Sequence, residues 1–265
     1  MRRNVALALS VACLLGLELA TLAAQVATSP KIWVGRYEEC ETFTRTAPIV
    51  RVEDIPVGVT RPRHGFFAPG GPVEGVAIKA LRPSRESGYF ESYQSEIAAY
   101  ELDKPLNMDM VPVTVARTYE GRPASAQLWV NDAVYRKTLR EQNQQAPNVS
   151  DWARQVNRWR VFDNLIANID RNEGNLLVLR SPDWHLVLID HSRAFTTTTR
   201  MVFEMPQIDR PFYERLKALD AKTLDARLGK LVLDGSRSIL RRRDIIVAQL
   251  EKLAAAKGEL QVFTP

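Results

Sequence analysis

The hydrophobic pattern of this chain changes character near its middle. Residues 51–130 carry short apolar runs separated by turn residues, a pattern typical of β-strands, with one helical stretch among them. Residues 151–169 and 209–257 instead have apolar residues at helical spacing, on either side of a short hairpin pattern. A β-rich half followed by a mainly helical half predicts an α+β protein with two lobes and a cleft between them. The length of 265 residues is sufficient for such a core.

The individual elements follow from apolar spacing and from turn residues. In the first half we expect strands between Ile55 and Leu81, with a turn at Gly70–Pro72, then a helix over Glu91–Leu106 and strands at Met110–Ala116 and Ala126–Val130. In the second half we expect a helix that Asp151 caps and that runs to about Ile169, a hairpin of Leu176–Leu179 with Leu186–Ile189, and helices within 209–257 broken at Gly229 and at Asp234–Gly235.

The N-terminal segment has the layout of a secretory signal peptide. Arg2 and Arg3 precede the apolar run Val5–Leu17, and small residues follow at Ala20–Ala24. Cleavage after Ala23 would leave residues 24–50 as an N-terminal extension, 51–130 as the first lobe and 131–265 as the second. An uncleaved membrane anchor is the alternative, and a buried helix is a third interpretation. We therefore expect an exported protein, periplasmic or secreted, or one attached to a membrane through this segment.

Charge and cysteine content exclude some classes of protein. The chain has 36 Lys and Arg against 31 Asp and Glu, a net charge of +5, which favours anionic ligands in general. The basic cluster Arg241–Arg243 has no interleaved aromatic residues, so nucleic-acid binding is not expected. After removal of residues 1–23 only Cys40 remains of the two cysteines, and one thiol cannot form an internal disulfide.

Several polar residues occur at places where an enzyme could use them. Lys79 ends the apolar run Val76–Ile78, and period-2 alternation points it away from the core face. Glu96 lies in the expected helix and could form an ion pair with Lys79, although Glu91 is a competing candidate. Each residue also has a simpler interpretation, as a solvated strand lysine or a surface helix charge.

A second group of polar residues follows in the helical half. Asp170 and Asn175 are spaced Asp-x-x-x-x-Asn in a polar loop after a helix, and Asp190 follows an apolar strand. The chain order of lysine, helix glutamate, Asp-x-x-x-x-Asn and strand-end aspartate is similar to the order in which kinases carry the residues that act in phosphoryl transfer from ATP. Asp170 would then lie beside an acceptor hydroxyl, while the amide of Asn175 and the carboxylate of Asp190 would bind Mg²⁺. Arg171 would either neutralise charge in the transition state or brace the loop.

Two segments resemble a known family. Asn168–Leu176 (NIDRNEGNL) is similar to the Asn-x-Asp-Arg-x-x-x-Asn segment of phosphatidylinositol 3-/4-kinase catalytic domains, most closely the type II 4-kinases. Leu188–Phe195 (LIDHSRAF) resembles their metal-binding Ile-Asp-Asn-Gly-x-x-Phe segment, and also the Asp-Asn-Gly-Arg-Gly-Phe segment of the secretory-pathway (Golgi casein) kinases. The resemblance is specific over residues 160–195 and loose over 57–130.

The resemblance implies a two-lobed protein-kinase-like fold and a role for each matching residue. Lys79 would contact the phosphates of ATP and Glu96 would orient Lys79. Asp170 would be the catalytic carboxylate, Asn175 and Asp190 would hold Mg²⁺, and Leu128–Trp129–Val130 would be the hinge against which adenine packs. The chain departs from the kinase pattern in three ways: no His precedes Asp170, no Gly-x-Gly-x-x-Gly loop is present, and His191–Ser192 replaces a small dipeptide.

The expected function is therefore ATP- and Mg²⁺-dependent phosphorylation of a hydroxyl group. The acceptor stays unidentified among proteins, lipids and small molecules, because no segment after residue 200 resembles a substrate motif. Two alternatives stay open. One is a pseudokinase that binds nucleotide or serves as a scaffold, and the other is a kinase-fold enzyme that transfers AMP. The sequence gives no oligomeric state.

Overall fold

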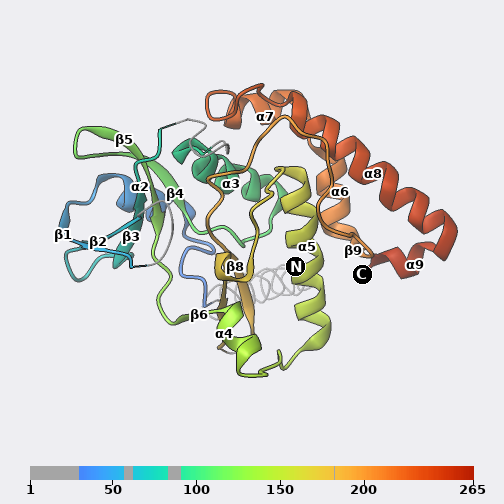
Figure 1. Ribbon diagram of the computed structural model, residues 1–265, viewed down its shortest axis with the longest axis horizontal. Coiled ribbons are helices and arrows are strands. Elements are labelled where there is room, and N and C mark those ends of the chain that lie inside the picture. Colours follow the sequence, from blue (N-terminus) through green and yellow to red (C-terminus); the bar gives the residue numbers. More distant parts are fainter. Residues whose placement is uncertain (1–29, 57–61, 83–90, 182) are drawn as a thin grey trace, which may run out of the picture.

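The computed structural model describes residues 30–56, 62–82, 91–181 and 183–265 (Figure 1). The expected signal segment, residues 1–23, lies outside the described residues, as do Val57 and Val59 of the expected strand region. Within the described ranges, none of the helices combines the length and the apolar character that a membrane crossing requires.

The first lobe is built on an antiparallel five-stranded sheet. Its strand order is β1-β2-β3-β5-β4. The strands are β1 (Ile49–Asp54), β2 (Arg63–Phe67), β3 (Gly75–Lys79), β4 (Thr114–Tyr119) and β5 (Arg122–Leu128). Helices α2 (Tyr37–Thr46) and α3 (Tyr93–Leu106) pack against β4 and β5. The structure confirms the expected β-rich half with one main helix. Helix α2 lies within residues 24–50, which the sequence predicts as an N-terminal extension.

The second lobe is mainly helical (Figure 1). A three-stranded sheet of β6 (Ala133–Tyr135), β7 (Leu176–Leu179) and β8 (His185–Leu188) lies next to the first lobe, and its β7–β8 pair confirms the expected hairpin. The helices are α4 (Arg136–Glu141), α5 (Val149–Leu165), the 3₁₀ turn η2 (Glu173–Asn175), α6 (Arg210–Ala218), α7 (Ala221–Leu228), α8 (Arg237–Lys257) and α9 (Glu259–Val262). The short strands β9 (Ile208–Asp209) and β10 (Phe263–Thr264) pair in parallel.

Two expected boundaries are wrong for physical reasons. Helix α5 is capped by Asn148, whose side chain accepts from the amide of Asp151, and it ends at Leu165 rather than near Ile169. The earlier end coincides with a left-handed backbone at Ala167, which has φ 52°. That turn starts the polar loop containing Asp170 four residues sooner than the apolar pattern suggested.

The strand expected at Met110–Ala116 begins instead at Thr114, and its partner begins at Arg122 rather than Ala126. The buried carboxylate of Asp103, in α3, accepts hydrogen bonds from the amides of residues 109, 110 and 111 at 2.9–3.0 Å. Amides that are held by a side chain are not available to a strand ladder.

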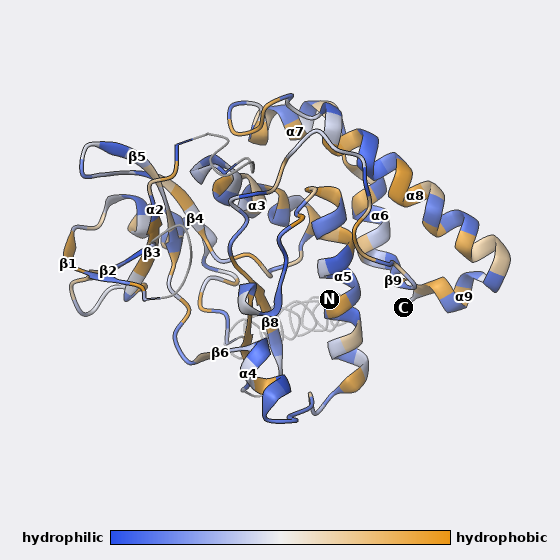
Figure 2. Ribbon diagram, in the orientation of Figure 1, coloured by the Kyte–Doolittle hydropathy of each residue, from blue (hydrophilic) through white to orange (hydrophobic). Residues whose placement is uncertain are grey.

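The apolar core runs through both lobes, and α8 supplies one wall of it in the second lobe. Figure 2 shows blue and orange residues alternating along α8, and the buried residues repeat every three or four positions from Ser238 to Ala254. Arg242 is the charged member of this buried stripe. It donates to the backbone carbonyls of Leu165, Thr196 and Thr198 at 2.6–2.9 Å, which fixes the start and the end of the chain segment between α5 and residue 198.

Candidate active site

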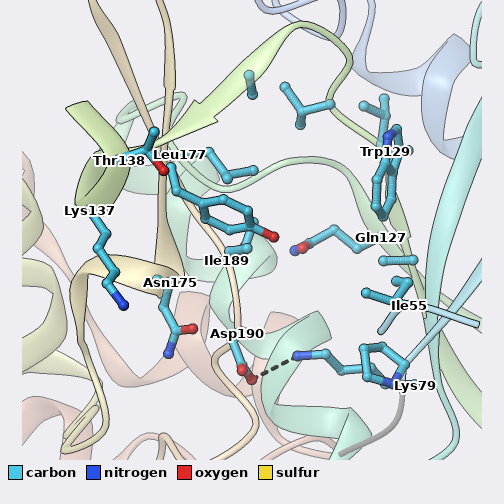
Figure 3. A pocket seen from close by; sticks show the side chains of 17 residues that line it. Ile55, Lys79, Gln127, Trp129, Lys137, Thr138, Asn175, Leu177, Ile189 and Asp190 are labelled. Carbon is cyan, nitrogen blue, oxygen red and sulfur yellow. Dashed lines mark hydrogen bonds and ion pairs between the residues drawn. The ribbon is translucent and has the colours of Figure 1, made fainter. Parts of the chain in front are cut away.

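A cavity of about 460 Å³ lies between the two lobes. The first lobe contributes Ala77 and Lys79 from β3 and the segment 127–130, which connects the lobes. The second lobe contributes residues around α4, the end of η2 at Asn175, and Ile189 and Asp190 after β8. In Figure 3, Lys79, Asp190 and Asn175 follow one another along one wall of this cavity.

Lys79 reaches the cavity because of strand alternation. Val76 and Ile78 of β3 are buried in the core, so Ala77 and Lys79 face the opposite side, where the cavity lies. The Nζ atom of Lys79 donates to Glu96 Oε1 at 2.5 Å and to Asp190 Oδ1 at 2.7 Å (Figure 3 draws the latter). The lysine thus joins β3, α3 and the segment after β8.

Glu96 is the helix carboxylate that meets Lys79. It is 2% exposed, and its second oxygen accepts from the amide of His191 at 3.0 Å. Burial alone would lower the pKa of Lys79 and raise that of Glu96, but the opposite charges outweigh burial. As a result the pKa of Lys79 is raised and that of Glu96 is lowered, so both are charged at neutral pH. The competing candidate, Glu91, contacts Arg193 instead.

The hairpin of β7 and β8 brings Asn175 and Asp190 together. Leu176 pairs with Leu188, so the residues just outside this pair lie at the same end of the hairpin, and the amide of Ile189 donates to the carbonyl of Asn175 at 3.2 Å. Asn175 uses its Nδ2 to donate to the carbonyl of Asp170 at 3.2 Å, which leaves its oxygen directed into the cavity (Figure 3). Asp190 has a left-handed backbone, φ 59°, and Ser192 Oγ donates to it at 3.1 Å.

Asp170 lies at the start of the loop, and its side chain is 44% exposed. The carboxylate accepts from Arg193 Nη1 at 3.1 Å, and the amide of Asp170 donates to Asn168 Oδ1 at 3.3 Å. Asp170 is not among the residues that line the cavity, so it lies beside the candidate nucleotide site rather than in it. Its carboxylate is open to solvent there.

Arg171 lies within the protein. Its side chain is 1% exposed, and it binds both carboxylate oxygens of Asp163, at 2.7 and 3.1 Å. Its Nη1 also donates to the carbonyls of Asn175 and Ile189, at 2.7 and 2.6 Å. Of the two roles considered for Arg171, these contacts support bracing the loop. Contact with a phosphoryl group in the cavity is not supported, because its guanidinium is occupied by internal partners.

The expected hinge lines the cavity at Leu128, Trp129 and Val130. The amide of Leu128 donates to the carbonyl of Val113 at 2.8 Å and that of Trp129 to the carbonyl of Gly75 at 2.9 Å. These two amides serve the fold and are not available to a base. The Trp129 ring stacks on His64 with centroids 3.8 Å apart, a contact between distant residues that sequence reasoning missed.

Sequence reasoning also missed several lining residues and one ion pair. Gln127, Tyr135, Lys137 and Thr138 line the cavity without belonging to any recognisable motif. Nor does sequence reasoning assign a role to Arg193. A signal for it existed, because an arginine stands at the same place in the Asp-Asn-Gly-Arg-Gly-Phe pattern quoted above.

The donor set at the cavity fits a metal that is shared with phosphates. Within the described ranges, no group of three or more His, Cys, Asp or Glu side chains could hold a metal ion without other ligands. Asp190 and Asn175 offer one carboxylate and one amide oxygen, both ligand types that Mg²⁺ accepts. Mg²⁺ is usually held by one or two side chains together with substrate phosphates and water, and the residues present match that requirement.

Comparison with known proteins agrees with this geometry. The family model for phosphatidylinositol 3- and 4-kinases matches residues 74–260. Among solved structures, the Golgi casein kinase with Mn/ADP bound is 16% identical with a TM-score of 0.62, and the match covers 85% of this chain and 78% of that chain. The Fam20 protein of hydra, solved with sugar, is 16% identical with a TM-score of 0.65, covering 84% of this chain and 90% of that chain.

No curated protein sequence matches the chain. At 16% identity the structural likeness establishes the fold, which is that of two-lobed kinases. The family match spans well over half of the chain and includes every residue that was singled out as a candidate. The chain therefore belongs to the phosphatidylinositol 3- and 4-kinase family.

Proposed function

We propose that the protein is an ATP- and Mg²⁺-dependent phosphotransferase that acts on a hydroxyl group. The observation that carries this proposal is the contact of Lys79 with both Glu96 and Asp190 at the wall of the interlobe cavity. One ammonium group is held at the cavity by carboxylates from two different lobes. Such a cation, beside a carboxylate and an amide oxygen that can take a metal, is what the phosphates of a nucleotide require.

Each residue has a definite part in the proposed reaction. Lys79 binds phosphate oxygens, and Glu96 holds it in place. Asp190 and Asn175 would hold Mg²⁺, which when bound supplies positive charge to the phosphates and orients them. Asp170 orients the acceptor hydroxyl and takes its proton as the oxygen bonds to phosphorus and the bond to the leaving ADP oxygen breaks.

The connection between the lobes would bind the base. Because the amides of Leu128 and Trp129 already donate to carbonyls of the fold, we assign recognition of the adenine edge to the backbone of Val130. The apolar side chains of Leu177 and Ile189 line the cavity from the second lobe and would cover the faces of the base.

ADP release from ATP and Mg²⁺ tests the proposal. We expect the purified protein to release ADP and Asp190→Ala to lose this activity while it keeps its fold, as checked by circular dichroism. Asp244→Ala is the matched control, because that carboxylate is 67% exposed on α8 and distant in sequence from the cavity residues. Activity of Asp190→Ala equal to that of the parent would refute the assignment of the site.

The same assay separates the two alternatives by product. Release of diphosphate instead of ADP would identify AMP transfer. ATP-dependent thermal stabilisation without turnover would identify a nucleotide-binding pseudokinase. The acceptor is left as a hydroxyl-bearing protein, lipid or small molecule.

We further propose that the protein is exported or anchored through residues 1–23. N-terminal sequencing of the mature protein tests this, since a chain that starts at Ala24 has been cleaved as the sequence predicts. A mature chain that starts at Met1 and is found in the cytoplasm would contradict it.

A further inference from the structure

The segment that follows β8 is attached to the start of α3 along its whole length. Four groups of residues 190–194 contact residues 91–96. The amide of His191 donates to Glu96 Oε2 at 3.0 Å, and the side chain of Arg193 donates to Glu91 Oε1 at 2.7 Å. The carbonyl of Ser192 accepts from the amide of Ser92 at 2.9 Å, and the carbonyl of Ala194 accepts from Ser95 Oγ at 3.2 Å. The helix of the first lobe is thereby fixed to the segment that carries Asp190.

Arg193 is the member of this segment that reaches a third element. Its Nε and Nη2 bind Oε1 of Glu91 at 2.7 and 2.6 Å, and its Nη1 donates to Oδ2 of Asp170 at 3.1 Å. The exposed fractions of the side chains rise along this chain of contacts, from 13% at Glu91 through 20% at Arg193 to 44% at Asp170. The guanidinium is therefore anchored firmly on the first lobe and offers its remaining edge to the loop.

The carboxylate of Asp170 depends on this contact for its orientation. The backbone of Asp170 is held by Asn168, Asn172 and Asn175. Its carboxylate, by contrast, accepts from Arg193 and from no other group in the part of the chain that the structure describes. The neighbouring Arg171 cannot replace Arg193, because it is occupied by Asp163 and two carbonyls.

We infer that Arg193 is a positioning residue, which sets the carboxylate of Asp170 and couples it to the first lobe through Glu91. The inference rests on the proposed function, because it assigns Asp170 to the acceptor hydroxyl. A carboxylate on an exposed loop samples several rotamers, and a bound guanidinium restricts them. Glu91 contacts neither Asp170 nor the cavity, so any effect of Glu91 on turnover must pass through Arg193.

Three variants test the inference: Arg193→Gln, Glu91→Gln and the pair combined. We expect kcat for ADP release to fall by about 10- to 100-fold in Arg193→Gln, the range that misplaced reacting groups produce, with KM for ATP unchanged. Glu91→Gln should lower kcat by a smaller factor. The combined variant should match Arg193→Gln, because the glutamate acts only through the arginine. Arg210→Gln is the matched control, since that arginine also binds a glutamate, Glu259 at 2.8 Å, and neither residue lines the cavity.

Hydrogen exchange provides a readout that does not depend on activity. Amides of the loop 168–176 should exchange faster in Arg193→Gln and in Glu91→Gln than in the parent, and at the parent's rate in Arg210→Gln. If Arg193→Gln does not fold, Arg193→Lys takes its place in both measurements. Lysine keeps the positive charge but loses the simultaneous contact with Glu91 and Asp170.

The inference is overturned if folded Arg193 and Glu91 variants keep both the parent's kcat and its exchange rates. It is also overturned if Glu91→Gln adds its full effect on top of Arg193→Gln. Failure of the proposed function looks different, because the parent itself would then release no ADP. In that case unchanged exchange in the variants would still refute the positioning contact, and faster exchange would support it.

Discussion

Replacing Arg171 with methionine separates the two roles that the sequence allowed for this residue. Methionine keeps much of the length and apolar surface of the side chain but removes the guanidinium. The change leaves Asp163, which is 1% exposed, without its cation, and it removes the donor from the carbonyls of Asn175 and Ile189. If Arg171 braces the loop, the loss must appear as lost stability.

The expected magnitude follows from these contacts. Removing one partner of a buried ion pair costs about 3–5 kcal/mol in the free energy of unfolding. The carbonyls of the half-buried Asn175 and Ile189, which each lose a donor, add about 1 kcal/mol each. For a protein of this size 1 kcal/mol corresponds to about 2–4 °C, so a loss of about 5–7 kcal/mol in Arg171→Met should lower the unfolding temperature by about 10–28 °C. Asp163→Leu combined with Arg171→Met should recover a large part of the loss, because no unpaired buried charge remains.

Thermal unfolding followed by far-ultraviolet circular dichroism measures this difference. The matched control is Arg140→Met, which removes a 68% exposed arginine that pairs with Glu173 of the same loop at 3.0 Å. An exposed pair contributes about 0–1 kcal/mol, so this control should unfold within a few degrees of the parent. The reasoning is refuted if Arg171→Met unfolds like the parent and loses only turnover, since the arginine would then act on the reacting phosphate.

Three further changes have defined outcomes. Lys79 holds the pKa of Glu96 below its ordinary value of 4.5. The Lys79–Glu96 ion pair therefore contributes its full stability above pH 4.5, and this contribution is lost as the pH falls toward the lower pKa of the folded state. The loss of stability in Glu96→Gln, measured by urea unfolding, should be larger at pH 7 than at pH 4. Gly75→Ala would place a Cβ atom 2.8 Å from the carbonyl oxygen of Gly65, and the overpacked sheet should lose about 1–3 kcal/mol in urea unfolding. Arg242→Met removes the side-chain donor from the carbonyl of the buried Leu165 and from the carbonyls of the half-buried Thr196 and Thr198, and it should lower the unfolding temperature by several degrees.

The parts of the site that sequence predicts are those fixed by local geometry. Lys79 faces the cavity because strand residues alternate, and Glu96 is buried because its helix packs on the sheet. Asn175 and Asp190 meet because the two ends of one hairpin come together. For these residues the short-range pattern determines the direction of the side chain, so the order of polar residues along the chain was sufficient.

The parts that sequence could not predict depend on packing between distant elements. Arg171 follows Asp170, the expected catalytic carboxylate, and Arg193 lies three residues after Asp190, the expected metal ligand. No local pattern says which of the two arginines is buried. The answer depends on Asp163, two residues before the end of α5, and on Glu91 in the other lobe. The end of α5 was misplaced for a related reason, because apolar residues continue past the point where the backbone turns.

The attachment of α3 to residues 190–194 also limits how the protein could be controlled. Moving α3 away from the cavity would break the four contacts of that segment together with the Lys79–Glu96 pair. At about 1 kcal/mol net for each of the four contacts, the displaced state costs at least about 4 kcal/mol and is populated at roughly one part in a thousand. The Lys79–Glu96 ion pair is therefore already formed in the protein rather than assembled on activation. In the proposed reaction, control of turnover would then act on access of nucleotide or acceptor, and the exposed carboxylate of Asp170 would be the point at which an acceptor first meets the site.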